Sequence, residues 1–295
     1  VFGIPDSEYM SIEHRGCINL MKGAIDYSDA VGTVSPTYAR EIMDPYYAHG
    51  LENVLLKNSF KLRGILNGID VDTYNPRTQP ALFANYDEDH MAGKAKGKAE
   101  LQKMLNLPVS PDTPVIAIVS RLVGHKGLDL VRAAMNDILR KNVQVVLLGK
   151  GDPDYENYFT HVQKMYDQKF SAVIAFNKDL SHKIYAGADI FLMPSKSEPC
   201  GLSQMMACRY GTIPVVRETG GLADSIVDCY NGDMGNGFRF SRYATDDMMG
   251  AIDRAVGLYT DYKDKWAGLV RRAMTTDFTW TSSAGEYIKN YKELL

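Results

Sequence analysis

The sequence ADIFLMPSKSEPCGLSQMMACRYG, residues 188–211, contains a short apolar run, a polar loop and a segment with helical character. The apolar run indicates a buried strand, and residues 202–210 predict a helix that ends at Gly211, a residue favoured just beyond helix ends. Open α/β sheets bind ligands where a loop leaves the carboxyl end of a parallel strand and enters a helix. This loop holds one carboxylate, Glu198, and the small turn Cys200-Gly201, so it is either a ligand site or an ordinary polar connection.

Strands and helices alternate on both sides of this stretch. The predicted strands are residues 115–119, 143–148, 172–176, 190–193 and 213–216, and the predicted helices between them are residues 128–140, 155–169, 181–188 and 202–210. Alternation of helices with continuously apolar strands predicts an α/β fold, with a parallel sheet covered by helices on both faces. Residues 237–240 predict one more short strand, and three helices follow, at 244–259, 262–274 and 280–295.

The first 75 residues contain fewer strands than a complete doubly wound domain requires. Helices are expected at 17–27, 37–43 and 51–58, and strands at 30–34 and 64–66. Ser35 and Pro36 form a typical helix start, with Ser as N-cap and Pro at the first helical position. Residues 75–93 form a connection rich in Pro, Asn, Asp and Gln, and residues 94–105 predict a Lys-rich helix with a solvated face.

Composition narrows the class of protein. The chain has 295 residues, 45% hydrophobic and 23% charged, with a net charge of −3, which supports a sizeable core in one or two domains. The slightly acidic balance argues against a nucleic acid or an anionic membrane as the main partner, and no apolar run is long enough to cross a bilayer. Residues 1–5 lack the features of a signal peptide. The four cysteines show no Cys-x-x-Cys spacing, so we expect reduced thiols, no metal site and a cytoplasmic location.

A candidate phosphate loop, Ser120–Gly127, lies between the first predicted strand of the sheet and its first helix. Arg121 and Lys126 flank a glycine turn at the start of that helix. Two positive side chains, together with the free N–H groups and dipole of a helix start, make a phosphate or diphosphate site. The alternative is a turn with incidental surface charges.

Three further features have both a functional and a structural interpretation. Gly220 and Gly221 follow the last clear strand, where adjacent glycines either let backbone N–H groups approach a ligand or form a simple turn. Residues 148–153 begin like a dinucleotide fingerprint, but Pro153 and the missing third glycine argue against a nicotinamide site. Phe176 either stacks on a nucleobase or belongs to the core.

Taken together, these segments resemble the bacterial glycogen synthase and plant starch synthase family, retaining glycosyltransferases that use ADP-glucose. The resemblance covers residues 33–42, 66–70, 120–130, 194–202 and 219–224, in the family's order. It implies the GT-B arrangement, in which two Rossmann-like domains face each other across a cleft. The family's Lys-x-Gly-Gly-Leu loop is absent, so we expect the chain to begin partway through the first domain.

The resemblance also implies roles for individual residues. Arg121 and Lys126 would bind the diphosphate and stabilise the departing ADP, with no metal required, and Glu198 would lie beside the donor glucose. These three are the expected catalytic residues. The substrate-binding residues that it implies are Asn67, Gly68, Phe176, Cys200, Gly201, Leu202, Ser203, Thr219, Gly220 and Gly221.

The expected organisation follows from the same resemblance. Residues 1–75 would be the remnant of the acceptor-side domain, residues 76–278 the nucleotide-sugar-binding domain, and residues 279–295 a helix that crosses back. We expect a hexosyltransferase that moves glucose from ADP-glucose to the non-reducing end of an α-1,4-glucan such as glycogen or starch, in the cytoplasm or, in a plant, the plastid. The alternatives are an incomplete fragment that binds a nucleotide sugar or glucan, and a related transferase that uses UDP-glucose.

Overall fold

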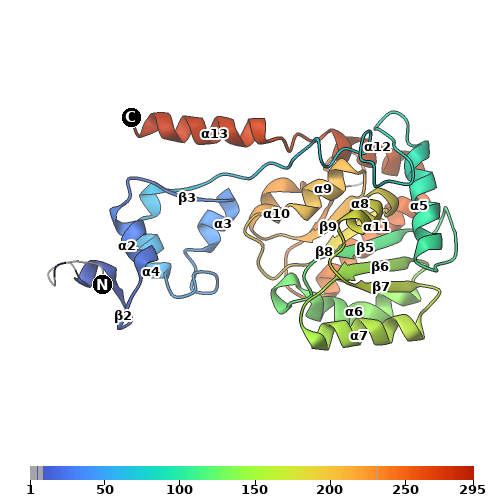
Figure 1. Ribbon diagram of the computed structural model, residues 1–295, viewed down its shortest axis with the longest axis horizontal. Helices are drawn as coiled ribbons and strands as arrows, with labels where there is room; N and C mark the ends of the chain where they lie inside the picture. The colour runs from blue at the N-terminus through green and yellow to red at the C-terminus, as the bar shows by residue number, and fades with distance from the viewer. Residues whose placement is uncertain (1–4, 6–8, 231) are drawn as a thin grey trace.

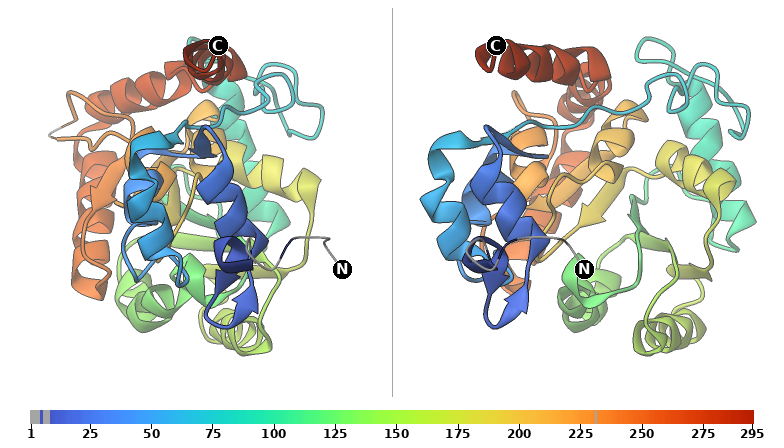
Figure 2. Two further views of the ribbon diagram at one scale, coloured as in Figure 1. Left: turned by 90° about the vertical axis from the view of Figure 1, so that its left-hand side faces the viewer. Right: turned by 60° about the vertical axis from the view of Figure 1, so that its left-hand side comes forward.

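The computed structural model describes Pro5, residues 9–230 and residues 232–295. The expectation about a signal peptide concerns residues 1–5 and therefore lies mostly outside this range. Within it, a small amino-terminal unit (residues 9–64) lies beside a larger sheet unit (residues 92–275), as Figures 1 and 2 show. The amino-terminal unit comprises α1 (Tyr9–Ile12), β1 (Glu13–His14), β2 (Cys17–Ile18), α2 (Leu20–Tyr27), β3 (Val31–Thr33), α3 (Pro36–Glu41), α4 (Glu52–Lys57), a 3-10 turn (Ser59–Lys61) and β4 (Leu62–Gly64).

The sheet unit is built on six parallel strands. In chain order they are β5 (Val115–Val119), β6 (Gln144–Gly149), β7 (Phe170–Ile174), β8 (Ile190–Met193), β9 (Ile213–Arg217) and β10 (Phe238–Phe240). Their order across the sheet is β10-β9-β8-β5-β6-β7, and every pair of neighbours is parallel. All residues of β6, β8 and β9 are buried, as expected for strands covered on both faces. The predicted α/β fold with a parallel sheet is confirmed.

Helices cover both faces of this sheet. In Figure 1, α6 and α7 lie on one side of the strands, and α8 and α9 lie on the other. The helices are α5 (Ala92–Met104), α6 (Leu128–Arg140), α7 (Pro153–Met165), α8 (Lys178–Gly187), α9 (Ser203–Arg209), α10 (Gly220–Ser225), α11 (Thr245–Asp261), α12 (Lys263–Thr275) and α13 (Trp280–Glu293), with a 3-10 turn at Gly124–Lys126. These helices and the strands together form the hydrophobic core, and the loops at the strand ends pack against it.

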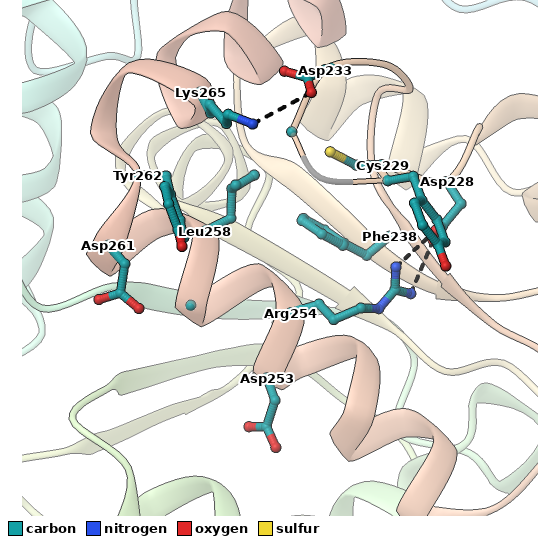
Figure 3. A pocket seen from close by; sticks show the side chains of 13 residues that line it. Asp228, Cys229, Asp233, Phe238, Asp253, Arg254, Leu258, Asp261, Tyr262 and Lys265 are labelled. Atoms are coloured by element: carbon teal, nitrogen blue, oxygen red, sulfur yellow. Dashed lines mark hydrogen bonds and ion pairs between the residues drawn. The ribbon is translucent and has the colours of Figure 1, made fainter.

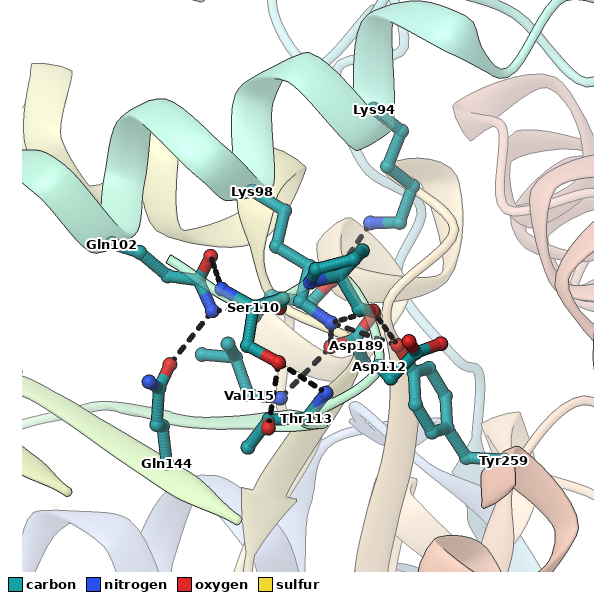
Figure 4. Close-up of polar contacts among 12 residues, drawn as sticks. Lys94, Lys98, Gln102, Ser110, Asp112, Thr113, Val115, Gln144, Asp189 and Tyr259 are labelled. Carbon is teal, nitrogen blue, oxygen red and sulfur yellow. Dashed lines mark hydrogen bonds and ion pairs between the residues drawn. The ribbon is translucent and has the colours of Figure 1, made fainter. Parts of the chain in front are cut away.

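The Lys-rich helix α5 has the expected solvated face, with Lys96 and Lys103 exposed, but two of its lysines are buried (Figure 4). Lys94 and Lys98 are only 9% and 6% exposed. The Lys94 ammonium donates to the carbonyl oxygens of Ala186, Ala188 and Tyr210 and to the Thr212 hydroxyl, at 2.9 to 3.1 Å. Lys98 forms an ion pair of 2.8 Å with Asp189. Both long side chains therefore fix α5 to the amino ends of the strands, and burial lowers the pKa of Lys94 to about 7.

Element boundaries in the amino-terminal unit differ from expectation for local reasons. The helix expected to start at Cys17 starts at Leu20, because Cys17–Ile18 pair with Glu13–His14 as strands. Asn19 is the N-cap, and its side chain accepts a hydrogen bond of 3.0 Å from the Lys22 amide. The predicted cap of α3 is confirmed, since the Ser35 hydroxyl accepts from the Tyr38 amide at 2.9 Å.

Two chain segments join the amino-terminal unit to the rest of the molecule, and they lie side by side. Ile69 pairs with Thr279 in a parallel bridge, and the Ile69 amide donates to the Phe278 carbonyl at 2.8 Å. Beyond this bridge, α13 runs alongside the amino-terminal unit (Figures 1 and 2), and the Ser283 hydroxyl donates to the Leu66 carbonyl at 2.6 Å. A hollow of about 640 Å³ is lined by residues near β3 and β4 and by residues of α13.

Candidate functional site

The two loops that sequence analysis singled out leave adjacent strands at the centre of the sheet. After β5 the chain continues to β6 and β7 on one side, whereas β8 leads to β9 and β10 on the other. The point where strand order reverses is the usual ligand site of open α/β sheets, because the two loops there separate and leave a crevice. The loop 120–127 follows β5, and the loop 194–202 follows β8.

Lys126 and Glu198 meet at this point. The Lys126 Nζ lies 2.6 Å from Glu198 Oε2, and their side chains are only 15% and 9% exposed. The Ser195 hydroxyl donates to the same carboxylate oxygen at 3.0 Å. Gly127 allows the two loops to approach each other, because its φ is +75° and a Cβ atom there would lie 1.9 Å from the Pro194 carbonyl oxygen. The structure therefore brings together two of the three expected catalytic residues.

The third, Arg121, is exposed on the same loop. One of its guanidinium nitrogens lies 3.4 Å from His125 Nε2. Burial, followed by the positive charges of Lys126 and Arg121, lowers the pKa of His125. A neutral imidazole beside two cations leaves their charge available to an anion.

The segment with an incomplete dinucleotide pattern supports this loop. Leu122 forms a parallel bridge with Gly151, and its amide donates to the Lys150 carbonyl at 3.0 Å. The Asp152 amide donates back to the Leu122 carbonyl at 2.7 Å. Residues 150–152 thus hold the backbone next to Arg121.

The turn after Glu198 is closed by a buried glutamine that sequence analysis did not identify. Gln204 donates to the carbonyls of Cys200 and Gly201, at 3.2 and 2.8 Å. Leu202 is partly exposed, and Ser203 begins α9. Burial raises the pKa of the Cys200 thiol, and a hydrogen bond with the Asn67 backbone opposes that rise. Asn67 therefore lies beside this turn.

Gly68 and Phe176 lie in different surroundings. Gly68 lies against the backbone of Thr279 and Trp280, at the junction of the two connecting segments. Phe176 follows β7 and is 92% exposed, so the core alternative considered for it is wrong. Its ring is free to stack on a planar group at the carboxyl edge of the sheet.

Gly220 and Gly221 lie against the backbone of Glu198, as expected of a loop from the neighbouring strand β9, and Thr219 precedes them. Their donors are used within the chain. The Thr219 hydroxyl and the Gly220 amide donate to Glu41 Oε1, at 2.9 and 3.0 Å, and the Gly221 amide donates to the carbonyls of Glu198 and Pro199, both at 3.1 Å. Glu41 belongs to the amino-terminal unit and was not predicted.

Arg217 is a second residue that sequence analysis missed. Its side chain is buried at the end of β9, and its Nε donates to the Ser195 carbonyl at 2.8 Å. Its Nη2 donates to the Lys196 carbonyl at 2.5 Å and to the Tyr47 hydroxyl at 3.2 Å. Arg217 therefore fixes the backbone of the loop 194–198 from the end of β9. Its sequence neighbours do not distinguish it from an arginine without this role.

A hollow of about 920 Å³ lies apart from these loops and contains none of the predicted site residues (Figure 3). On its wall, Arg254 forms a forked pair with Asp228, at 2.8 and 3.1 Å. Among residues 9–230 and 232–295, no group of three or more His, Cys, Asp or Glu side chains could hold a metal ion. Within the same part of the chain, no helix is long and apolar enough to span a bilayer.

The chain has the GT-B class of glycosyltransferase fold: its Rossmann-like parallel sheet carries the candidate ligand loops at the switch point and lies beside a second, smaller unit. Residues 102–265 match the family described as Glycosyl transferases group 1, and residues 1–57 match the starch synthase catalytic domain. The chain belongs to the glycosyl transferases group 1 family. The resemblance stated from the motifs is thereby confirmed.

Individual relatives agree. The chain is 47% identical over 287 residues to a glycogen synthase of Clostridium perfringens, covering 97% of this chain and 59% of that protein. It is 47% identical over 296 residues to a glycogen synthase of Thermotoga maritima, covering 99% of this chain and 61% of the relative. This chain thus spans about three fifths of the curated relatives it matches.

Solved structures place the fold in the same group. The catalytic domain of starch synthase IV from Arabidopsis thaliana, bound to ADP and acarbose, superposes with a TM-score of 0.91 at 36% identity. That match covers 99% of this chain and 62% of the other. A sucrose-phosphate synthase from Thermosynechococcus elongatus, with a TM-score of 0.63 at 19% identity and coverage of 97% and 65%, shares the fold alone.

Proposed function

We propose that the protein carrying this chain is a glycogen or starch synthase, which transfers glucose from ADP-glucose to the non-reducing end of an α-1,4-glucan with retention of configuration. The observation that carries the proposal is the meeting of Lys126 and Glu198 at the switch point of the sheet. The relatives named glycogen synthase and the starch synthase bound to ADP and acarbose support the choice of substrates.

The chemistry assigns a task to each side of the pair. Cleavage of the bond between glucose and diphosphate leaves negative charge on phosphate oxygens, which cations must stabilise more strongly in the transition state than in the ground state. Arg121 and Lys126 supply that charge without a metal. Glu198, held by Lys126 and Ser195, presents a carboxylate on the other side, where the sugar carbon becomes electron-poor.

A donor comparison tests the proposal. The natural full-length protein should release nucleotide from ADP-glucose in the presence of glycogen or a maltooligosaccharide, and lengthen the glucan by α-1,4 bonds. UDP-glucose should be a much poorer donor. Preference for UDP-glucose, or nucleotide release without glucan lengthening, would overturn the assignment.

A second candidate function is nucleotide-sugar binding without transfer, because this chain spans only about three fifths of the relatives it matches. A polypeptide limited to these 295 residues is a nucleotide-sugar-binding fragment, if residues elsewhere in the relatives complete the cleft. Calorimetry that shows ADP binding by this polypeptide, with no glucosyl transfer, supports that candidate. Measurable turnover by the same polypeptide disproves it.

A further inference from the structure

Two short helices, α3 of the amino-terminal unit and α10 of the sheet unit, each place a carboxylate at the start of the other. Glu41, the last residue of α3, accepts hydrogen bonds from the Thr219 hydroxyl and the Gly220 amide, at 2.9 and 3.0 Å. Asp224, near the end of α10, accepts from the Thr37 amide and hydroxyl, at 3.0 and 2.6 Å, and from the Ser35 hydroxyl. Each carboxylate lies at the start of the other helix, where amide groups have no partners within the helix.

The Glu41 end of this exchange continues to Glu198. Gly220 and Gly221 pack directly on the backbone of Glu198 and Cys200, since a Cβ atom would lie 2.0 Å from the Glu198 carbonyl oxygen and 1.9 Å from that of Cys200. The Gly221 amide also donates to the Glu198 carbonyl at 3.1 Å. A displacement of residues 219–221 therefore moves the backbone of Glu198, because no side chain lies between the two segments.

We propose that Glu41 is a positioning residue for the reaction. Its carboxylate fixes Thr219 and Gly220 when the two units are together, and through them sets the place of Glu198 beside the sugar. This inference rests on the proposed function. It also gives Thr219 and Gly220 a different task from the expected substrate binding, since Glu41 already accepts from both.

Glu41 lies one step further from the nucleotide loop than Glu198, which itself pairs with Lys126. Glu41 has no hydrogen bond or ion pair with the loop 120–127, which holds Arg121 and Lys126. Loss of Glu41 should therefore lower kcat more than it weakens ADP binding. A mere structural support of the fold would instead change stability and ligand binding together.

Two variants of Glu41 and one control form the test, made in the natural full-length protein. Glu41→Ala removes the acceptor. Glu41→Gln keeps an acceptor oxygen but replaces Oε2, a buried atom with no hydrogen-bond partner among the described residues, by an amide nitrogen. Glu52→Ala is the control, because Glu52 also has a buried Oε2 atom without such a partner, yet lies within the amino-terminal unit at 3.6 Å from Arg15.

We expect Glu41→Ala to lower kcat by about 10- to 100-fold, the effect of a displacement of roughly an ångström at a reacting group, while Kd for ADP changes less than about threefold. Glu41→Gln should recover part of that loss, and Glu52→Ala should leave kcat unchanged. The proposal is overturned if kcat falls less than threefold in Glu41→Ala, if Kd for ADP rises as much as kcat falls, or if the Glu52 control loses as much activity.

Hydrogen exchange separates failure of this inference from failure of the proposed function. In the unliganded protein, the Gly220 amide should exchange faster in Glu41→Ala than in the wild type. Unchanged exchange at Gly220 contradicts the inference whatever the activity. If the wild-type protein transfers no glucose from ADP-glucose, the proposed function is wrong, and exchange at Gly220 still decides whether Glu41 fixes the loop.

Discussion

Substitution of Glu198 by Gln should tighten ADP binding while it abolishes most of the glucosyl transfer. In this structure Lys126 donates to Glu198 at 2.6 Å, so an arriving diphosphate competes with the carboxylate for the ammonium group. In Glu198→Gln the ammonium still donates a charge-assisted hydrogen bond, but the Coulomb attraction of the carboxylate is lost, which amounts to about 1–1.5 kcal/mol at this separation even at the dielectric constant of water. At about 1.4 kcal/mol per tenfold, Kd for ADP should fall roughly five- to tenfold.

The measurement is titration calorimetry of ADP at constant ionic strength, with Glu218→Gln as control. Glu218 lies next to Thr219, and its side chain is 39% exposed and paired with Arg239 at 3.3 Å. The control removes the same unit of charge without contacting Lys126, and solvent and salt screen its effect. Weaker ADP binding by Glu198→Gln, or an equal gain in the control, would refute the reasoning that Glu198 and the diphosphate share one cation.

Three other expectations concern stability. Gly127→Ala should lower the free energy of unfolding by more than about 2 kcal/mol in urea denaturation, because a side chain at φ +75° is strained and its Cβ would meet the Pro194 carbonyl at 1.9 Å; an effect under 1 kcal/mol contradicts the close approach of the loops. The pKa of Lys94 is lowered from an ordinary 10.5 to about 7 in the folded state, so the unfolded chain binds this proton more tightly. The free energy of unfolding of the wild type should therefore rise between pH 7 and pH 9, by up to about 1.4 kcal/mol per pH unit. Urea denaturation at pH 7, 8 and 9 should show no such rise for Lys94→Met, and an equal rise in the variant would exclude Lys94 as its source. The pKa of His125 is also lowered in the folded state, so the unfolded chain takes up a proton on this ring first as the pH falls below about 6.5. The Tm should therefore fall less between pH 7 and pH 5.5 in His125→Gln than in the wild type. An identical fall in Tm would show that His125 does not contribute to the pH dependence of stability.

The sheet and its central site could be predicted from sequence because both depend on local patterns. The bounds of β5, α6 and β8 are the predicted ones, since polar, charged, Pro or Gly residues flank each segment. The approach of Lys126 and Glu198, 72 residues apart, follows from the rule that parallel strands bring their carboxyl ends to one edge.

The contacts that sequence analysis missed join residues with no local pattern in common. Glu41 and Thr219 are 178 residues apart, and Thr37 and Asp224 are 187 apart. The start of α3 was predicted from Ser35 and Pro36, but the carboxylate that completes it, Asp224, comes from the other unit. The burial of Lys94 and Lys98 was not predicted for the same reason, because their acceptors, the Ala186 carbonyl and Asp189, become neighbours only in the folded chain.

The paired connections at Ile69 and Thr279 restrict how the amino-terminal unit can move. A single peptide linker allows rotation about its own direction as well as bending. Two linkers held side by side by a hydrogen bond resist twisting, because torsion would pull one segment past the other, yet both can flex together. Bending at this pair of segments keeps their hydrogen bond, whereas twisting would break it, so the bridge favours the orientation in which Glu41 meets its two donors.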